Sequence, residues 1–130
     1  MFSAERSRTV ALPPLVLGGL RPLYRQMAHN HVHSASFEYL AAGAAVNACV
    51  IVGAHGPELK LSVPDRDLDI TFTMSTHFRV VPAMTAETYR ALCDIAAPGD
   101  EPSSEIVVGF LRRIVARAPA VLSRTHACAA

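Results

Sequence analysis

The segment ELKLSVPDRDLDITFTMS, residues 58–75, decides the fold of this chain. Apolar residues alternate with polar ones on both sides of residues 64–67, and a period of two is typical of a strand with one buried face. Proline and aspartate favour turns, so the two halves predict an antiparallel hairpin. One register keeps all the apolar side chains on one face, and a slip of one residue would expose them. That register pairs Val63 with Leu68, Leu61 with Ile70, and Leu59 with Phe72.

The sequence on either side extends this hairpin into a sheet. SASFEYLA (34–41) places Phe37 and Tyr39 on one face and Glu38 on the other. AAVNACVIV (44–52) is more uniformly apolar, which predicts a strand covered on both faces. HFRVV (77–81) either lengthens the second hairpin strand or forms a short strand of its own. We therefore expect an antiparallel β-meander of four to five strands.

The C-terminal third changes to a helical period. Thr85 is a good N-cap for a first helix, and Ser103 or Ser104 for a second, each with a glutamate in the first turn. Pro119 should end the second helix, and a shorter helix is expected over 22–28, where proline occupies the first turn. The second helix carries a wide apolar stripe: Ile106, Val107, Phe110, Leu111, Ile114 and Val115.

These elements predict a single α+β domain over residues 1–130. A sheet with one apolar face needs a cover, and amphipathic helices that follow it in the chain can supply one. The expected architecture is a two-layer sandwich, with the meander covered by two C-terminal helices and a short N-terminal helix beside them. We treat residues 1–17 as part of this fold, because Pro13 and Pro14 interrupt their apolar stretch and Glu5 fits a presequence poorly.

Composition excludes several classes of protein. Hydrophobic residues make up 51% and charged residues 18%, which indicates a globular chain. No uncharged apolar run approaches the roughly 18–20 residues that span a bilayer, so we expect no membrane association. The three cysteines form no CxxC pair, which favours reduced thiols and a cytoplasmic location.

Charge is unevenly distributed along the chain. Residues 1–33 and 106–130 are basic, and residues 34–105 hold ten acids against four basic residues. The basic ends are expected to fold over the acidic middle. A single lysine and no tryptophan argue against a nucleic-acid surface.

The segment HNHVH, residues 29–33, is the most distinctive chemical pattern and contains half of the six histidines. In an extended backbone His29, His31 and His33 would project to one side, and neighbours two apart can share one zinc, iron or manganese ion. In a helix, residues two apart diverge by about 200° and cannot share an ion. A metal site here therefore requires a strand; otherwise the histidines lie in a connection between helix and strand.

His31, His33 and Glu38 also have the H-x-H, four residues, glutamate order of the first metal motif of cupins. The flanking glycines of that motif are not at their expected positions, and no second motif of Pro-x-Gly followed by histidine is present. We therefore assign no family. The candidate metal ligands are His31, His33 and Glu38, with His29 or His77 as possible additions.

Other catalytic and binding motifs are absent from the sequence. Asp65, Asp67 and Asp69 have the spacing that begins a calcium loop, but Ile70 stands where that loop needs glycine and Thr76 where it needs glutamate. There is no G-x-S-x-G, P-loop or G-x-G-x-x-G motif. No catalytic residue and no cofactor are therefore assigned from the sequence.

Two hypotheses for function remain open. The first is a small non-catalytic regulatory protein (a regulator, inhibitor, immunity protein or adaptor) that binds a protein partner. The alternative is a small metal-binding protein or metal-dependent enzyme that uses His31, His33 and Glu38. We also expect a homodimer, because the stripe on 106–115 and the uncharged run ALPPLVLGGL (11–20) offer more apolar surface than one core needs. The competing interpretation is that residues 11–20 pack against the open end of the sheet and leave a monomer.

Overall fold

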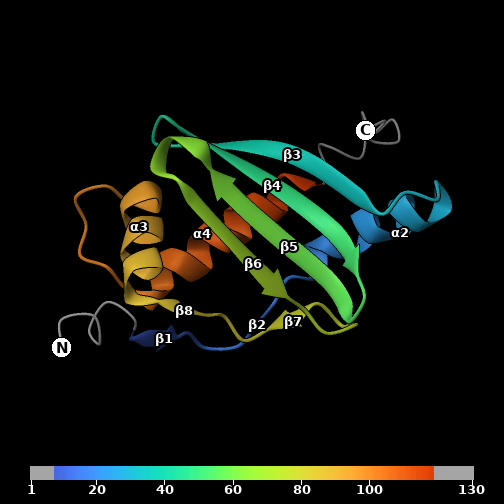
Figure 1. The fold of residues 1–130 in the computed structure, drawn as a ribbon, viewed down its shortest axis with the longest axis horizontal. Coiled ribbons are helices and arrows are strands. Elements are labelled where there is room, and N and C mark those ends of the chain that lie inside the picture. Colours follow the sequence, from blue (N-terminus) through green and yellow to red (C-terminus); the bar gives the residue numbers. More distant parts are fainter. Residues whose placement is uncertain (1–7, 119–130) are drawn as a thin grey trace.

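A four-stranded antiparallel sheet forms the centre of the computed structural model, which describes residues 8–118 (Figure 1). Its strand order is β3-β4-β5-β6, so each strand pairs with its neighbour in sequence. The strands are β3 (Ser34–Ala41), β4 (Ala44–Gly53), β5 (Gly56–Val63) and β6 (Leu68–Thr73). The predicted meander is confirmed, with four strands in the sheet.

The β5–β6 hairpin has the predicted register. Val63 pairs with Leu68, Leu61 with Ile70, and Leu59 with Phe72. The three β5 side chains are almost fully buried, whereas Leu68 and Ile70 are only partly buried because β6 has a strand on one side alone. The turn is a short 3₁₀ helix, η2 (Pro64–Arg66), followed by Asp67 in the left-handed region at φ 50°. The alternation of apolar residues therefore predicted both the hairpin and its pairing.

The β3–β4 hairpin turns through Ala42 and Gly43. Both have positive φ, 49° and 84°, as a two-residue type I′ turn requires. Glycine adopts this conformation freely, while an alanine does so at a steric cost. The register then pairs Phe37 with Ala48 and Glu38 with Asn47.

The prediction that residues 44–52 are covered on both faces is wrong for the part of the chain that the structure describes. Val46, Ala48 and Val50 on one face of β4 are fully buried, but Asn47 on the other face is exposed. Small and weakly polar side chains, Ala45 and Cys49, occupy the second face and are only partly buried. The apolar run therefore reflects Ala45, Cys49 and Ile51, which are only partly covered on the open face.

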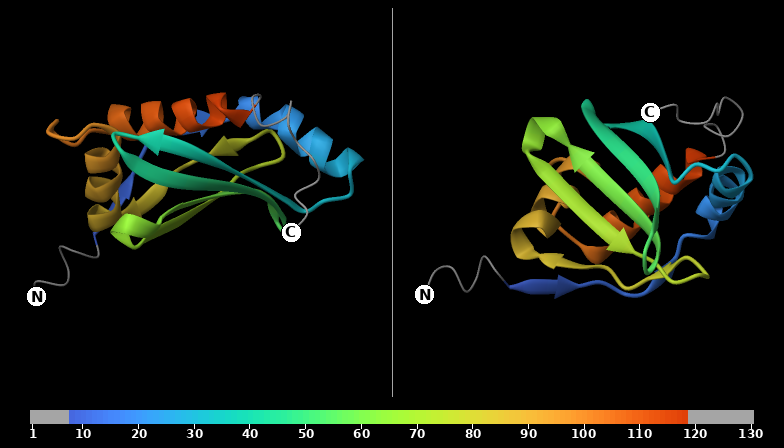
Figure 2. Two further views of the ribbon diagram at one scale, coloured as in Figure 1. Left: turned by 90° about the horizontal axis from the view of Figure 1, so that it is seen from above. Right: turned by 45° about the vertical axis from the view of Figure 1, so that its right-hand side comes forward.

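Helices cover the other face of the sheet, as predicted. They are α2 (Arg21–His29) and α4 (Ser104–Ala116), and α3 (Ala86–Ala96) packs beside α4. Figure 2 shows α2 and α4 in one layer against the sheet, while α3 stands at one end of it. Both predicted caps form, because Thr85 Oγ1 accepts from the Thr88 N–H (3.2 Å) and Ser103 Oγ from the Ile106 N–H (3.3 Å). The described helices include none that is long and apolar enough to cross a membrane.

The contact between helix layer and sheet is centred on Phe110 of α4. Phe110 is fully buried, and its ring meets that of Tyr39 edge-on at 6.0 Å between centroids. Within residues 8–118 no polar or charged side chain is fully buried. The core between the layers is therefore entirely apolar where the structure describes it.

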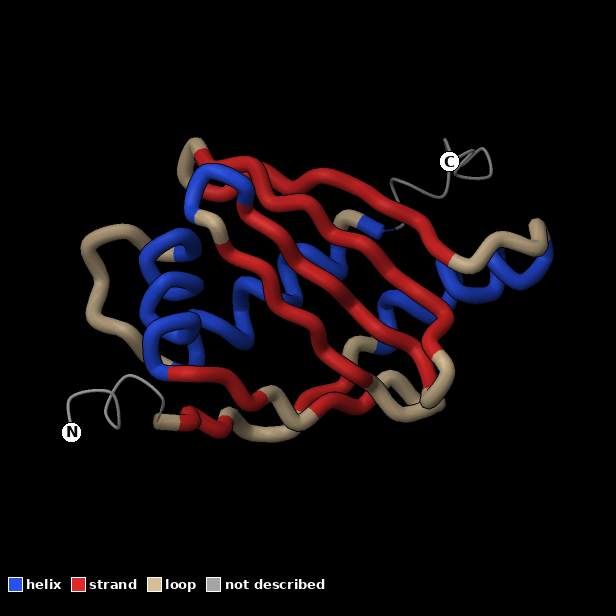
Figure 3. Tube along the Cα trace, viewed as in Figure 1, coloured by secondary structure: helices blue, strands red, loops and turns tan. Residues whose placement is uncertain are grey.

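The N-terminal segment pairs with the chain that follows β6. Strand β1 (Thr9–Ala11) lies antiparallel to β8 (Ala83–Thr85), and β2 (Leu15–Val16) lies antiparallel to β7 (Arg79–Val80) (Figure 3). The sequence predicted a short strand near 77–81 but not its partner. The run 11–20 packs inward, as the competing interpretation held, with four leucines buried: Leu12, Leu15, Leu17 and Leu20. The short 3₁₀ helix η1 (Gly18–Leu20) then leads into α2.

A tyrosine joins α2 to the sheet. The Tyr24 hydroxyl lies 2.7 Å from the Glu58 carbonyl oxygen and 2.9 Å from that of Ile51, and it accepts from the Glu58 N–H at 3.1 Å. Burial raises the pKa of Tyr24 to about 12. The neutral hydroxyl therefore persists throughout the physiological range and holds α2 against the ends of β4 and β5.

Candidate functional site

The histidine segment does not have the geometry that a shared metal ion needs. Helix α2 ends at His29, Asn30 is its C-cap, and His31 is in the left-handed region at φ 57°. Residues 29–33 are therefore a helix end and a turn, so the extended backbone required for metal binding is absent there. His33 connects to the sheet through its carbonyl oxygen, which accepts from the Val52 N–H at 2.9 Å.

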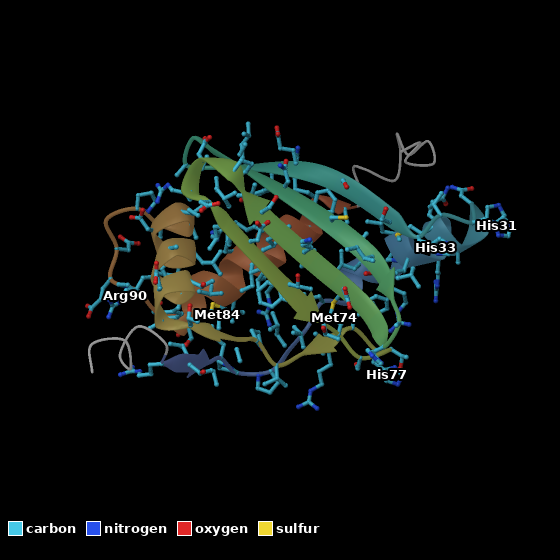
Figure 4. The ribbon with its side chains drawn as sticks, viewed as in Figure 1. His31, His33, Met74, His77, Met84 and Arg90 are labelled. Carbon is cyan, nitrogen blue, oxygen red and sulfur yellow. The ribbon has the colours of Figure 1, made fainter. Side chains whose placement is uncertain are left out.

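The other candidate ligands lie on separate elements. Glu38 is exposed on β3, and Figure 4 shows His77 in the turn after β6, apart from His31 and His33 at the end of α2. Between residues 8 and 118, no three His, Cys, Asp or Glu side chains are grouped so that they could hold a metal ion. The structure thus does not bring His31, His33 and Glu38 together.

We expect the double variant His31→Ala, His33→Ala to keep its fold, since both side chains are exposed and the described hydrogen bond of His33 uses its backbone. We also expect the native protein, purified without a histidine tag, to carry less than one zinc, iron or manganese ion per chain. Elemental analysis and thermal unfolding of both proteins check this. About one ion per chain, lost in the double variant, would restore the metal hypothesis.

The aspartates of the β5–β6 turn form no calcium loop. Asp65 and Asp67 are exposed in the turn, and Asp69 is already in β6. Arg66 between them bonds instead to Asp94 of α3 at 2.8 Å, with both side chains about half exposed. This part of the chain is a solvated hairpin end that contacts α3.

Neither described cysteine has the surroundings of a nucleophile. Cys93 is buried in α3, where its thiol donates to the Ser103 carbonyl oxygen at 3.6 Å, and burial raises its pKa. A raised pKa disfavours the reactive thiolate. Cys49 is partly buried on the open sheet face, and Cys128 lies outside the described residues.

The open face of the sheet is hollowed around Cys49. The hollow is about 460 Å³ and is lined from β3, β4, β5 and β6 by Ser36, Phe37, Asn47, Ala48, Cys49, Lys60, Ser62 and Asp69. Its charged groups, Lys60 and Asp69, are of opposite sign and both exposed. The hollow therefore offers a polar surface without an excess of either charge.

A different depression runs between residues 13–19 and the outer side of α4, and we name it the α4 groove. It consists of two hollows that meet at Arg112. The first, of about 340 Å³, is lined by Pro13, Pro14, Leu15, Ser104, Glu105, Val108, Gly109 and Arg112. The second, of about 310 Å³, is lined by Val16, Leu17, Gly18, Gly19, Arg112, Val115 and Ala116.

Two glycines shape the α4 groove. A Cβ on Gly19 would lie 2.8 Å from Val115 Cγ1, so glycine is needed for residues 18–19 to approach α4 this closely. Gly109 on α4 leaves the floor of the first hollow without a side chain, and a Cβ there would lie 3.5 Å from the guanidinium of Arg113. Val16 on the opposite wall is 59% exposed. The groove therefore has apolar walls open to solvent.

One arginine lines both hollows of the α4 groove, and a second arginine lies close to the first hollow. Arg112 is exposed and belongs to both hollows, and Arg113 is exposed beside Gly109. The ion pair found among residues 8–118, Arg66–Asp94, involves neither of them. Glu105 supplies one carboxylate at the far end of the first hollow. Arg112 is therefore the guanidinium that an external carboxylate in the groove can reach, with Arg113 close to the first hollow.

Sequence reasoning did not find the α4 groove. It identified the two segments that form it, 11–20 and 106–115, but as surface left over from the core. The available signals were Pro13–Pro14 and Gly18–Gly19, which prevent a regular element, and Gly109 inside an otherwise apolar helix.

Comparison with known proteins gives no assignment: no family model, no curated protein and no solved structure matches this chain.

Proposed function

We propose that this protein is a non-catalytic interaction protein, of the regulator, inhibitor, immunity or adaptor type, and that the α4 groove receives a segment of its protein partner. The observation that supports this most is the pair of apolar hollows with Arg112 between them. An open apolar groove next to exposed charge is typical of surfaces that bind another chain. No specific observation favours the metal-dependent alternative.

Charge complementarity selects the partner. Arg112 and Arg113 favour a carboxylate, and guanidinium binds carboxylate through two parallel hydrogen bonds. The hollows on either side favour apolar side chains. The partner segment is therefore acidic and apolar, with an aspartate or glutamate between two apolar residues.

Helix geometry sets the spacing of those apolar residues. The centres of the two hollows are separated by about seven residues of α4, or about 10 Å at 1.5 Å per residue. A segment in the polyproline II conformation covers about 9 Å in three residues, and with three residues per turn it presents residues three apart on the same side. The matching pattern is an apolar residue, two residues that include the acid, and a second apolar residue.

Binding of defined synthetic peptides tests the proposal. The probes are fluorescent 12-residue peptides with two leucines three positions apart and glutamates between them, and the same peptides with lysines. We expect the acidic peptides to bind the native protein more tightly, and Arg112→Glu to weaken this binding by about fivefold or more, since it reverses a charge at the contact. Fluorescence polarisation against protein concentration measures both.

The matched control is Arg90→Glu. Arg90 is exposed on α3 (Figure 4) and lines neither hollow of the groove, and its reversal changes the net charge by the same amount. It should alter binding by less than about twofold, because distant exposed charges are screened. Equal binding of acidic and basic peptides, no binding of either, or an equal effect of the two variants would refute the assignment of the groove.

We also infer that the chain forms a homodimer, although through a surface other than the expected one. The apolar stripe of 106–115 and the leucines of 11–20 are mostly buried in the core, and what these segments leave open is the α4 groove, which we assign to the protein partner. A cytoplasmic location remains part of the proposal, supported by Cys49 and Cys93, which are both unpaired thiols.

A further inference from the structure

Within residues 8–118, strand β3 forms one border of the sheet and pairs with β4 alone. The Val52 N–H bonds to the His33 carbonyl oxygen, and residues of an antiparallel strand alternate between bonded and non-bonded pairs. Residues 35, 37, 39 and 41 therefore turn their backbone groups toward β4. Ser34, Ser36, Glu38 and Leu40 turn theirs outward, and none of these outward groups is bonded within residues 8–118.

This edge has few of the features that protect edge strands. β3 is eight residues long, contains neither proline nor lysine, and pairs with β4 without a bulge. Glu38 is its single charged residue, and Leu40 is 69% exposed. Long edges of this kind are templates for a further strand. β6, at the other border, also has a strand on one side alone, but it has six residues against eight in β3, and the chain then continues into β7 and β8, which pair with β2 and β1 (Figure 3).

We propose that a second copy of this chain occupies the β3 edge, so that two β3 strands pair antiparallel across a two-fold axis and the sheets join into one of eight strands. The inference rests on the proposed homodimer, whose surface it names, and is independent of the α4 groove. The axis passes beside Phe37, and Ser36 of each copy lies opposite Glu38 of the other.

This register uses the whole edge. Ser34 lies opposite Leu40 and Ser36 opposite Glu38, so all four outward residues of each copy are paired. A shift that places Ser36 opposite itself leaves Leu40 without a strand partner. A shift the other way places the two Glu38 carboxylates directly opposite each other, and facing like charges destabilise a sheet.

The side chains of this register are complementary on both faces. On the open face each Ser36 hydroxyl can donate to the Glu38 carboxylate across the axis, twice by symmetry. On the core face the two Phe37 residues form a non-bonded pair, whose Cα atoms lie about 4.5 Å apart. Phe37 is 8% exposed at the strand edge, and aromatic cross-strand pairs stabilise antiparallel sheets.

Charge changes at Ser36 test the register. Because of the two-fold axis, the pair of residue 36 with Glu38 of the other copy occurs twice. Ser36→Asp makes both pairs repulsive, and Ser36→Lys makes both attractive. Both side chains are on an exposed face, so the monomer fold should tolerate either. We expect the dissociation constant of the dimer to rise about tenfold or more in Ser36→Asp and to fall or stay equal in Ser36→Lys.

The measurement is sedimentation equilibrium over a range of micromolar concentrations, with the mass expected near twice 13.9 kDa for the native chain. Thr71→Asp, on the same open face but on β6, is the control and should leave the dissociation constant unchanged. A monomeric native chain would refute the dimer altogether. If the native chain is a dimer and neither Ser36→Asp nor Thr71→Asp changes its dissociation constant, the homodimer stands but the β3 edge is not its interface.

Amide hydrogen exchange gives a second readout. The N–H groups of Ser34, Ser36, Glu38 and Leu40 should be protected above the dissociation constant and exchange quickly below it, while those of Ala35 and Phe37 stay protected at both concentrations. Fast exchange of the four at every concentration would overturn the proposal. So would concentration-independent protection that disappears when residues 119–130 are removed, because the chain's own C-terminal segment would then occupy the edge.

Discussion

Replacing Phe110 with alanine is expected to lower the free energy of unfolding by about 3–5 kcal/mol, the range for large aromatic side chains removed from a core. Phe110 is fully buried between α4 and the sheet, and it meets Tyr39 of β3 edge-on. The truncation removes that aromatic contact and leaves a cavity that the two layers can close only in part. Urea or guanidinium unfolding followed by circular dichroism measures the change.

Val108→Ala is the matched control on the same helix. Val108 lies on the outer side of α4, lines the α4 groove and is only partly buried, so its truncation should cost less than about 1 kcal/mol. If Phe110→Ala also cost less than about 1 kcal/mol, α4 would not be the cover of the sheet.

Leu17→Ala is expected to lower the free energy of unfolding by about 2–5 kcal/mol, as for other buried leucines. Leu17 is 2% exposed, although it lies in an irregular segment, and its N–H bonds to the Phe78 carbonyl oxygen at 2.8 Å. The variant keeps this backbone bond and removes only the side chain from the core. The same unfolding experiment measures it.

The neighbouring Val16→Ala provides the comparison. Val16 is 59% exposed, so its truncation should stay within about 0.5 kcal/mol. The two variants decide between an N-terminal segment that belongs to the core and one that merely lies on the surface. If both variants changed the free energy of unfolding by the same small amount, residues 11–20 would form exposed apolar surface, as first expected from their composition.

The parts of the fold that could be predicted are those whose pattern is local. Strict alternation in 58–75 has one register that buries its apolar residues, and Thr85 and Ser103 each cap a helix through atoms three residues away. Strands β1 and β2 could not be predicted, because they are three and two residues long and their partners lie about 65–75 residues further on.

The candidate site was harder to predict for a related reason. The metal hypothesis depended on the backbone of five residues, and α2 extends one residue further than expected, to His29. The turn that follows then has no room for a strand before Ser34. The α4 groove joins two segments that are distant in sequence, so no single motif in either segment marks it.

The order of strands along the chain also governs how the protein is made. Strands β3 to β6 are joined by turns of two to four residues, so the sheet can assemble from contacts that form quickly as the chain leaves the ribosome. Thr9 can pair only after Thr85 has been synthesised, and the sheet is covered later still, when α4, the last described helix, has been made. During that interval the nascent sheet exposes the face that α4 later covers, together with the unpaired edge of β3. Intermediates of this kind aggregate readily, so the yield of folded protein will depend on translation rate and chaperone supply more than its small size suggests.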